Sequence, residues 1–138
     1  MSHKKARQAY EARLGTWAAA RSPVLLVAYE NDPFTPATGT TYLRAFCLPA
    51  ATDSQDLEGA HRAYLGVFQV NVVAPLNTGG GAANGIADEL AALFVNNTRI
   101  TISGLAVQQI SPAAIAPAVQ VLDRYVVPVS WRYRADTT

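Results

Sequence analysis

The chain has 138 residues, which fits one domain spanning residues 1–138 and allows roughly two-thirds of the unfolded surface to be buried. Half of the residues are hydrophobic and 15% are charged, whereas about 25% are charged in ordinary soluble domains. The formal net charge of +1 excludes a strong overall field for attracting nucleic acid or an anionic membrane. We therefore expect a protein partner to cover part of the surface.

Cysteine content and hydropathy indicate the compartment. The single cysteine, Cys47, excludes an internal disulfide and a cysteine-based zinc motif. No apolar run approaches the roughly 18 residues of a membrane span, and the basic, amphipathic start is unlike a secretory signal. These features predict a soluble protein that is made and acts in a reducing cytoplasm.

The first predicted element is a helix. Four apolar side chains recur at spacings of four, four and three residues and therefore share one helix face: Ala6, Tyr10, Leu14 and Trp17. The helix should end at Arg21 because Pro23 disfavours helical geometry in the residue before it.

Two strands should follow, over 24–29 and 42–48. Apolar groups occupy both faces of the second strand, which predicts a central position in a sheet. Between the strands, Pro33 and Pro36 bracket Phe34. We interpret this segment as a recognition loop.

Residues 49–63 form a polar stretch that predicts a long connection without secondary structure. Such connections are usually functional or disordered. The acids beside its histidine also fit a metal or pH-sensitive contact, although solvated side chains are the more common explanation. We select five of its side chains as interface candidates: Asp53, Asp56, Glu58, His61 and Arg62.

The second half of the chain predicts further alternation of strands and helix. In order, we expect a half-buried strand over 64–74, a helix over 82–94, a broken strand or a hairpin over 100–110, an extended arm or loop over 111–122 and a strand over 124–134. Pro128 has no amide hydrogen, so the last strand should lie at an edge or carry a bulge. The order predicts an α+β fold, a mainly antiparallel sheet of about five to six strands with two helices packed on one face.

No set of residues predicts catalysis, a cofactor or a metal site. The glycines 79–81 open a helix but lack the Gly-Lys-Ser/Thr sequence of a phosphate loop. Cys47 is expected on an apolar strand face, where free cysteine ordinarily packs as an inert small hydrophobe. Asp88 and Glu89 are adjacent on a helix and cannot face each other as an acid–base pair. The sequence predicts that the protein is not an enzyme.

Arginines on the predicted strands are better candidates for protein contacts. A guanidinium group can bind carboxylates across an interface, and four arginines fall on strands: Arg44, Arg124, Arg132 and Arg134. We select three of them as interface candidates: Arg44, Arg132 and Arg134. The last two share the polar face of the final strand. Asp32 and Phe34 in the proline-bracketed loop complete the candidate interface residues.

Several segments, in chain order, resemble the phage tail terminator family, the lambda-like proteins that cap the head-proximal end of a long tail. The resembling segments are Ala-Arg-Leu-Gly-Thr-Trp-Ala at 12–18, Asn-Asp-Pro-Phe-Thr-Pro at 31–36, Tyr-Leu-Arg at 42–44, the strand 66–72, the helix 87–94 and the closing strand 125–134. The similarity covers nearly the whole chain. The order of the segments is more specific than any single one.

The resemblance implies a virion tail protein that assembles in the cytoplasm of the bacterial host as a ring, typically a hexamer, on the tip of the tail tube. The implied partners are further copies of the chain, the tail tube protein and a head-completion or connector protein. Neither a membrane nor a specific nucleic acid partner is expected. Two alternatives stay open: a neck or head–tail connector protein of related fold, and a small-ligand-binding α+β module.

Overall fold

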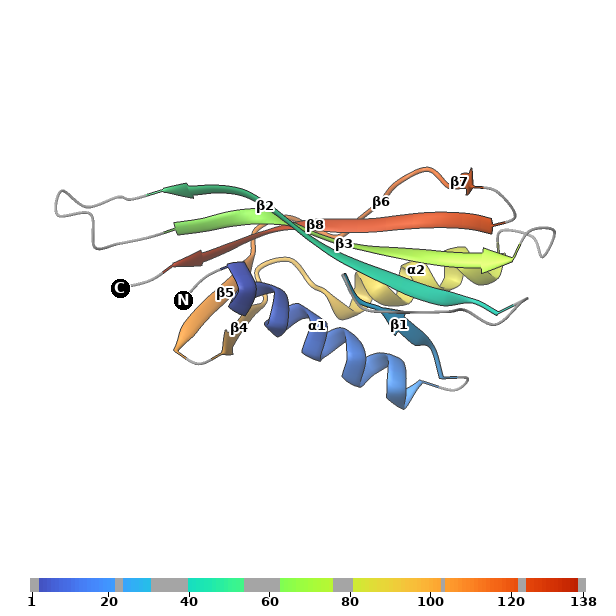
Figure 1. Cartoon of the computed structure of the whole chain (residues 1–138), viewed down its shortest axis with the longest axis horizontal. Coiled ribbons are helices and arrows are strands. Elements are labelled where there is room, and N and C mark those ends of the chain that lie inside the picture. The colour runs from blue at the N-terminus through green and yellow to red at the C-terminus, as the bar shows by residue number, and fades with distance from the viewer. Residues whose placement is uncertain are drawn as a thin grey trace, which may run out of the picture.

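The computed structural model of the chain describes residues 3–21, 24–30, 40–53, 63–75, 81–102, 104–121 and 124–136. Within these ranges it contains two helices and eight strands (Figure 1). The helices are α1 (His3–Ala20) and α2 (Gly81–Leu93). The strands are β1 (Leu26–Ala28), β2 (Tyr42–Asp53), β3 (Ala63–Pro75), β4 (Arg99–Ile102), β5 (Leu105–Gln109), β6 (Ala114–Ile115), β7 (Val119–Val121) and β8 (Arg124–Asp136).

All of the described strands belong to one curled sheet. Its order is β1-β2-β3-β8-β5-β4, and β6 and β7 also pair with β8. The α+β class is confirmed, but the sheet is mixed and has eight strands, not the predicted five to six in a mainly antiparallel arrangement. The parallel pairing of β1 with β2 is possible because residues 29–41 give the chain a long enough crossover.

A cluster of aromatic rings occupies the centre of the core. Tyr10 of α1 and Phe94, next to α2, both contact Trp131 of β8, with ring centroids 5.6 and 4.1 Å apart. Phe68 is the cross-strand partner of Trp131 in β3, with a centroid distance of 5.4 Å. All four rings are buried. The cluster therefore joins both helical segments to the same face of the two central strands.

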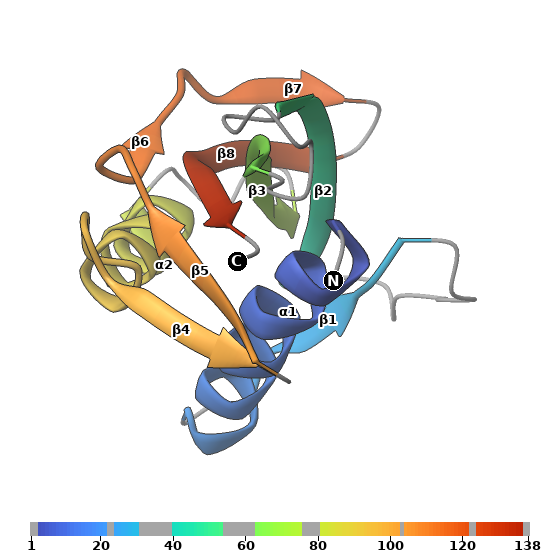
Figure 2. The same cartoon turned by 90° about the vertical axis from the view of Figure 1, so that its left-hand side faces the viewer.

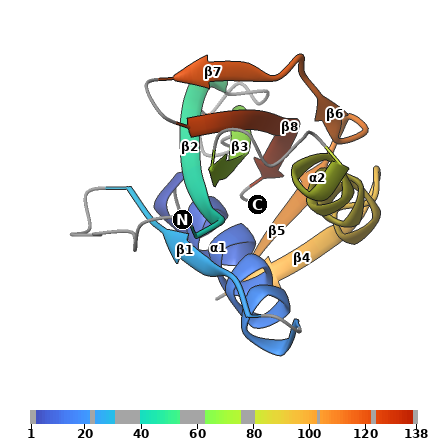
Figure 3. The same cartoon turned by 90° about the vertical axis from the view of Figure 1, so that its right-hand side faces the viewer.

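Helix α1 lies between the two ends of the curled sheet. Figures 2 and 3 view the molecule along its strands, and in both α1 lies between β1 and β4. The helix contacts both of these strands. Neither α1 nor α2 combines the length and apolar character that a membrane crossing requires.

Strand β2 is longer than predicted. Residues 49–53, expected as part of a polar connection, continue the strand, with a register shift between Pro49 and Thr52. The amide of Cys47 donates to the Glu30 carboxylate on the side away from β3, and strand alternation directs the nitrogen of Pro49 to that same side. A proline is tolerated there because β1 ends opposite Arg44 and leaves this edge unpaired.

The prediction of an edge strand or a bulge at Pro128 is wrong. Strand β8 lies centrally, and its register with β3 continues unbroken through the pair Asn71 and Pro128. The carbonyl of Pro128 accepts a hydrogen bond from the Ala116 amide at 2.9 Å, between β6 and β7. The nitrogen of Pro128 therefore faces the β6–β7 side, and the ladder with β3 loses no hydrogen bond.

Gly66 has no space for a side chain. A Cβ there would lie 2.5 Å from the Tyr133 hydroxyl and 2.8 Å from the Leu48 carbonyl. We predict that Gly66→Ala lowers the free energy of unfolding by about 1–3 kcal/mol, as overpacking does. The control is Gly85→Ala, where a Cβ on α2 would meet open space; it should raise that free energy by about 0.5–1 kcal/mol. Urea titrations followed by circular dichroism measure both, and an unchanged Gly66→Ala midpoint contradicts the prediction.

Gln109 is fully buried, and its amide holds the end of α2 against the start of the 110–121 segment. Its Nε2 donates to the carbonyls of Phe94 and Ser111 at 2.8 and 2.9 Å. We predict that Gln109→Leu, which leaves the Phe94 carbonyl without this donor, costs about 1–3 kcal/mol of unfolding free energy. The half-buried neighbour Gln108, whose hydrogen bond with Arg99 lies at the surface, is the control, and Gln108→Leu should change the free energy by less than about 0.5 kcal/mol. Equal urea midpoints for the two variants would contradict this role.

Candidate protein interaction surface

One face of the sheet is turned away from both helices. In Figure 1, α1 and α2 lie below the sheet, and no described helix lies above it. Arg44 of β2 pairs with Asn71 of β3, and Asn71 pairs with Pro128 of β8. Because side chains alternate along a strand, Arg132 and Arg134 lie on the same face as Pro128. The structure thus brings together the three arginines that the sequence selected.

Two further arginines share this face. Arg99 of β4 pairs with Gln108, which in turn pairs with Arg134. The guanidinium groups of Arg124 and Arg44 each lie 5.6 Å from the centroid of the Tyr42 ring, on which both stack. We call these five residues the arginine face: Arg44, Arg99, Arg124, Arg132 and Arg134.

Few negative charges accompany the arginine face. Among the described side chains, the carboxylate on this face is that of Asp136, and Arg134 Nε donates to both of its oxygens at 3.1 Å. Arg132 and Arg44 are exposed. Within the same part of the chain, neither forms an ion pair with a carboxylate. Among the described residues, this face therefore carries more arginines than carboxylates.

Apolar side chains lie between the arginines. Leu48 is 48% exposed, and Phe46, Leu65 and Val67 are half-buried. Protein interfaces are enriched in arginine and aromatic residues and depleted in lysine. The composition of the arginine face therefore fits a protein partner.

The other predicted interface residues are less well placed. Asp53 is the last residue of β2 and pairs with Ala63 of β3, which in turn pairs with Asp136 of β8. The structure describes only the backbone of Asp53. The remaining candidates lie outside the described residues: Asp32, Phe34, Asp56, Glu58, His61 and Arg62.

A buried polar group lies on the opposite, helix-facing side of the sheet. His3 Nδ1 is 2.7 Å from the Tyr133 hydroxyl, which is 3.5 Å from Cys47 Sγ. Burial raises the pKa of the Cys47 thiol and that of the Tyr133 hydroxyl, and it lowers the pKa of His3. A thiol with a raised pKa is a poor nucleophile. The predicted packing of Cys47 in the core is confirmed.

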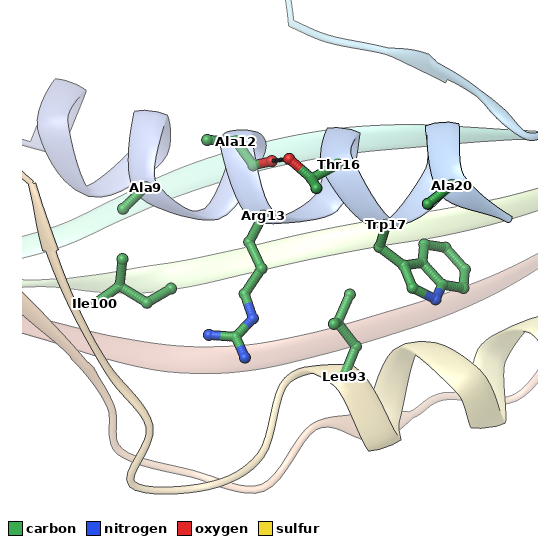
Figure 4. Close-up of a pocket in the computed structure, with 8 residues that line it drawn as sticks. All are labelled: Ala9, Ala12, Arg13, Thr16, Trp17, Ala20, Leu93 and Ile100. Atoms are coloured by element: carbon green, nitrogen blue, oxygen red, sulfur yellow. Dashed lines mark hydrogen bonds between the residues drawn. The ribbon is translucent and has the colours of Figure 1, made fainter.

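A groove of about 560 Å³ runs beside α1 (Figure 4). Its walls are alanines of α1 together with Trp17, Leu93 and Ile100, and Arg13 reaches across it. Sites for small molecules combine apolar walls with several convergent polar groups. The hydroxyl of Thr16 donates a hydrogen bond to the Ala12 carbonyl of the same helix. This leaves the guanidinium group of Arg13 to orient a ligand. Nowhere in the described ranges do three His, Cys, Asp or Glu side chains group as metal ligands.

Arg99 and Gln109 were not selected from the sequence. The place of Arg99 depends on the register between β4 and β5, and that of Gln109 on the approach of α2 to β5, so no local pattern indicates either. Arg124 was placed on a strand from the sequence but was not selected as an interface residue, although two-residue alternation along the last strand places it with Arg132 and Arg134.

Comparisons with known proteins agree with the resemblance seen in the sequence. A sequence model of the family described as phage tail terminator protein matches residues 5–133, nearly the whole chain. One solved structure is 43% identical, with a TM-score of 0.84, and the match covers 100% of this chain and 98% of that chain. No curated protein matches. The chain belongs to the phage tail terminator family and is a structural component of the phage tail.

Proposed function

We propose that this protein caps the head-proximal end of the tail tube, stops the polymerisation of the tube protein and presents a surface to a head-completion or connector protein. The family match over residues 5–133 is the observation that carries this proposal. The cap is a ring of copies, typically six, assembled in the cytoplasm of the bacterial host. The cap acts by binding and has no catalytic step.

The physical requirement for such a cap is a subunit with several different contact surfaces. One surface binds the last tube ring, another faces the head, and two more join neighbouring copies. Contacts within a closed ring are heterologous, so each copy presents two unlike patches to its neighbours. The uncovered, arginine-bearing sheet face supports this proposal because it combines charge with exposed apolar groups such as Leu48.

We assign these contacts to two groups of residues. The first group is Arg44, Arg132 and Arg134 on the uncovered face. The second group comes from the proline-bracketed loop and the 53–62 segment: Asp32, Phe34, Asp53, Asp56, Glu58, His61 and Arg62. Phe34 is the proposed apolar anchor.

The capping activity can be measured directly. We predict that the purified protein, added to its cognate tail tube protein during polymerisation, shortens the tubes and leaves a ring at one end. Negative-stain electron microscopy gives the length distribution and the fraction of ringed ends. Tubes of unchanged length without rings would contradict the proposal. Binding to a portal-side partner without tube arrest would instead favour a neck protein.

Substitution of Phe34 distinguishes an effect on assembly from an effect on folding. We predict that Phe34→Ala raises the concentration needed for capping by about 30-fold, the loss expected of an interface hot spot. Its urea midpoint should stay at the wild-type value. A variant that caps normally, or one whose stability falls by the roughly 3–5 kcal/mol of a core phenylalanine truncation, would contradict the anchor role.

A further inference from the structure

We propose that, in the ring, the arginine face of one copy binds the exposed side of α2 in a second copy. The inference rests on the proposed ring and names the two unlike patches that its neighbouring subunits would join.

Among the described side chains, the arginine face has few negative charges within its own copy. Of the described side chains, Asp136 supplies its carboxylate, and that group is already held by Arg134. Arg44 and Arg132 project from β2 and β8 without a carboxylate partner in the described ranges. A partner that brings carboxylates to this face would reduce the mutual repulsion of the guanidinium groups and add charge-assisted hydrogen bonds.

Helix α2 is acidic and lacks basic residues. Its sequence contains Asp88 and Glu89 and no lysine or arginine. Asp88 is exposed, and Glu89 keeps 45% of its side-chain surface exposed while it binds Arg21 at 2.8 Å. The carboxylates of Glu11 and Glu30, by contrast, face Arg7 and the Cys47 amide within the same copy. Of the described carboxylates, that of Asp88 is therefore the best placed for a neighbouring copy.

The exposed side of α2 also permits a close approach. Its first turns carry Gly81, Ala82, Asn84 and Gly85, and a Cβ at either glycine would meet open space. None of the described residues in these turns has a large exposed side chain that would hold a neighbouring sheet away. The apolar side chains between the arginines can then pack against the helix while the guanidinium groups reach Asp88.

The two patches lie on opposite sides of one sheet. Helix α2 packs against β3 and β8 through Ala83, Ile86, Ala87 and Leu90, which are buried. The arginine face is the other side of the same strands. One copy can therefore engage two neighbours at once, one through each patch. Such a contact is heterologous, and successive contacts close into a ring when the rotation allows it.

The composition of the arginine face favours protein over nucleic acid. Surfaces that bind DNA are more polar and much more positively charged than protein interfaces. Here, half-buried Phe46, Leu65 and Val67 and exposed Leu48 separate the arginines, and the two lysines of the chain lie on α1. Binding of duplex DNA to this face in place of a neighbouring copy would overturn the proposal.

A charge exchange tests the pairing. The double variant Arg44→Glu with Arg132→Glu should reduce the fraction of ringed tube ends by about tenfold or more, since like charges across an interface repel Asp88. Asp88→Arg alone should do the same. Combining all three substitutions should restore at least part of the wild-type fraction. The matched control, Lys4→Glu with Arg13→Glu, makes the same change in net charge on α1 and should leave ringed ends unchanged.

The outcomes separate this inference from the proposed function. If the wild type forms no rings and arrests no tubes, the proposed function fails. If the wild type forms rings and the double variant matches it, or if Asp88→Arg neither impairs rings nor rescues the double variant, the pairing with α2 is wrong. A third measurement is the binding of a 20-base-pair DNA duplex, followed by fluorescence anisotropy. Wild-type binding that the double variant loses while its rings remain intact would assign the face to nucleic acid.

Discussion

The contact of Tyr10 and Phe94 with Trp131 is the interaction on which the rest of the structure depends. Trp131 lies in the central strand β8, and its ring stacks on Phe94 and meets Tyr10 edge-on. Phe68 supports it from β3. Because aromatic rings bury large areas and prefer such tilted and offset arrangements, this cluster determines how close each helix comes to the sheet. The position of α2, and so of its exposed carboxylates, follows from it.

Strand alternation connects this core to the proposed contacts. Trp131 points toward the helices, and the next residue, Arg132, must point away from them. The same rule separates Val129 and Tyr133, which are buried, from Ser130 and Arg134. The packing that stabilises the subunit therefore also presents the arginines to a partner. A cap that acts by binding needs this division of one sheet into a core face and a contact face.

Much of the fold follows from local patterns. The apolar spacing of α1, the alternation along β3 and β8 and the hairpin of β4 with β5 were predicted, because each depends on residues close in sequence. The errors occurred where distant segments decide the outcome. Pro128 sits in a central strand because its nitrogen faces the break between β6 and β7 and not the continuous ladder with β3. Strand β2 passes Pro49 because β1 has already ended. Short β6 and β7 exist only by pairing with β8.

The sequence by itself determined the class of the fold, the family and the burial of Cys47, since periodicity and the order of segments are properties of the chain. Only the tertiary structure decided that arginines from β2, β4 and β8 share one face and that α2 lies on the other. The physical reason is that cross-strand register and helix packing join residues far apart in sequence. Charge summed along the chain is nearly zero, whereas the fold gathers arginines from three strands on one face.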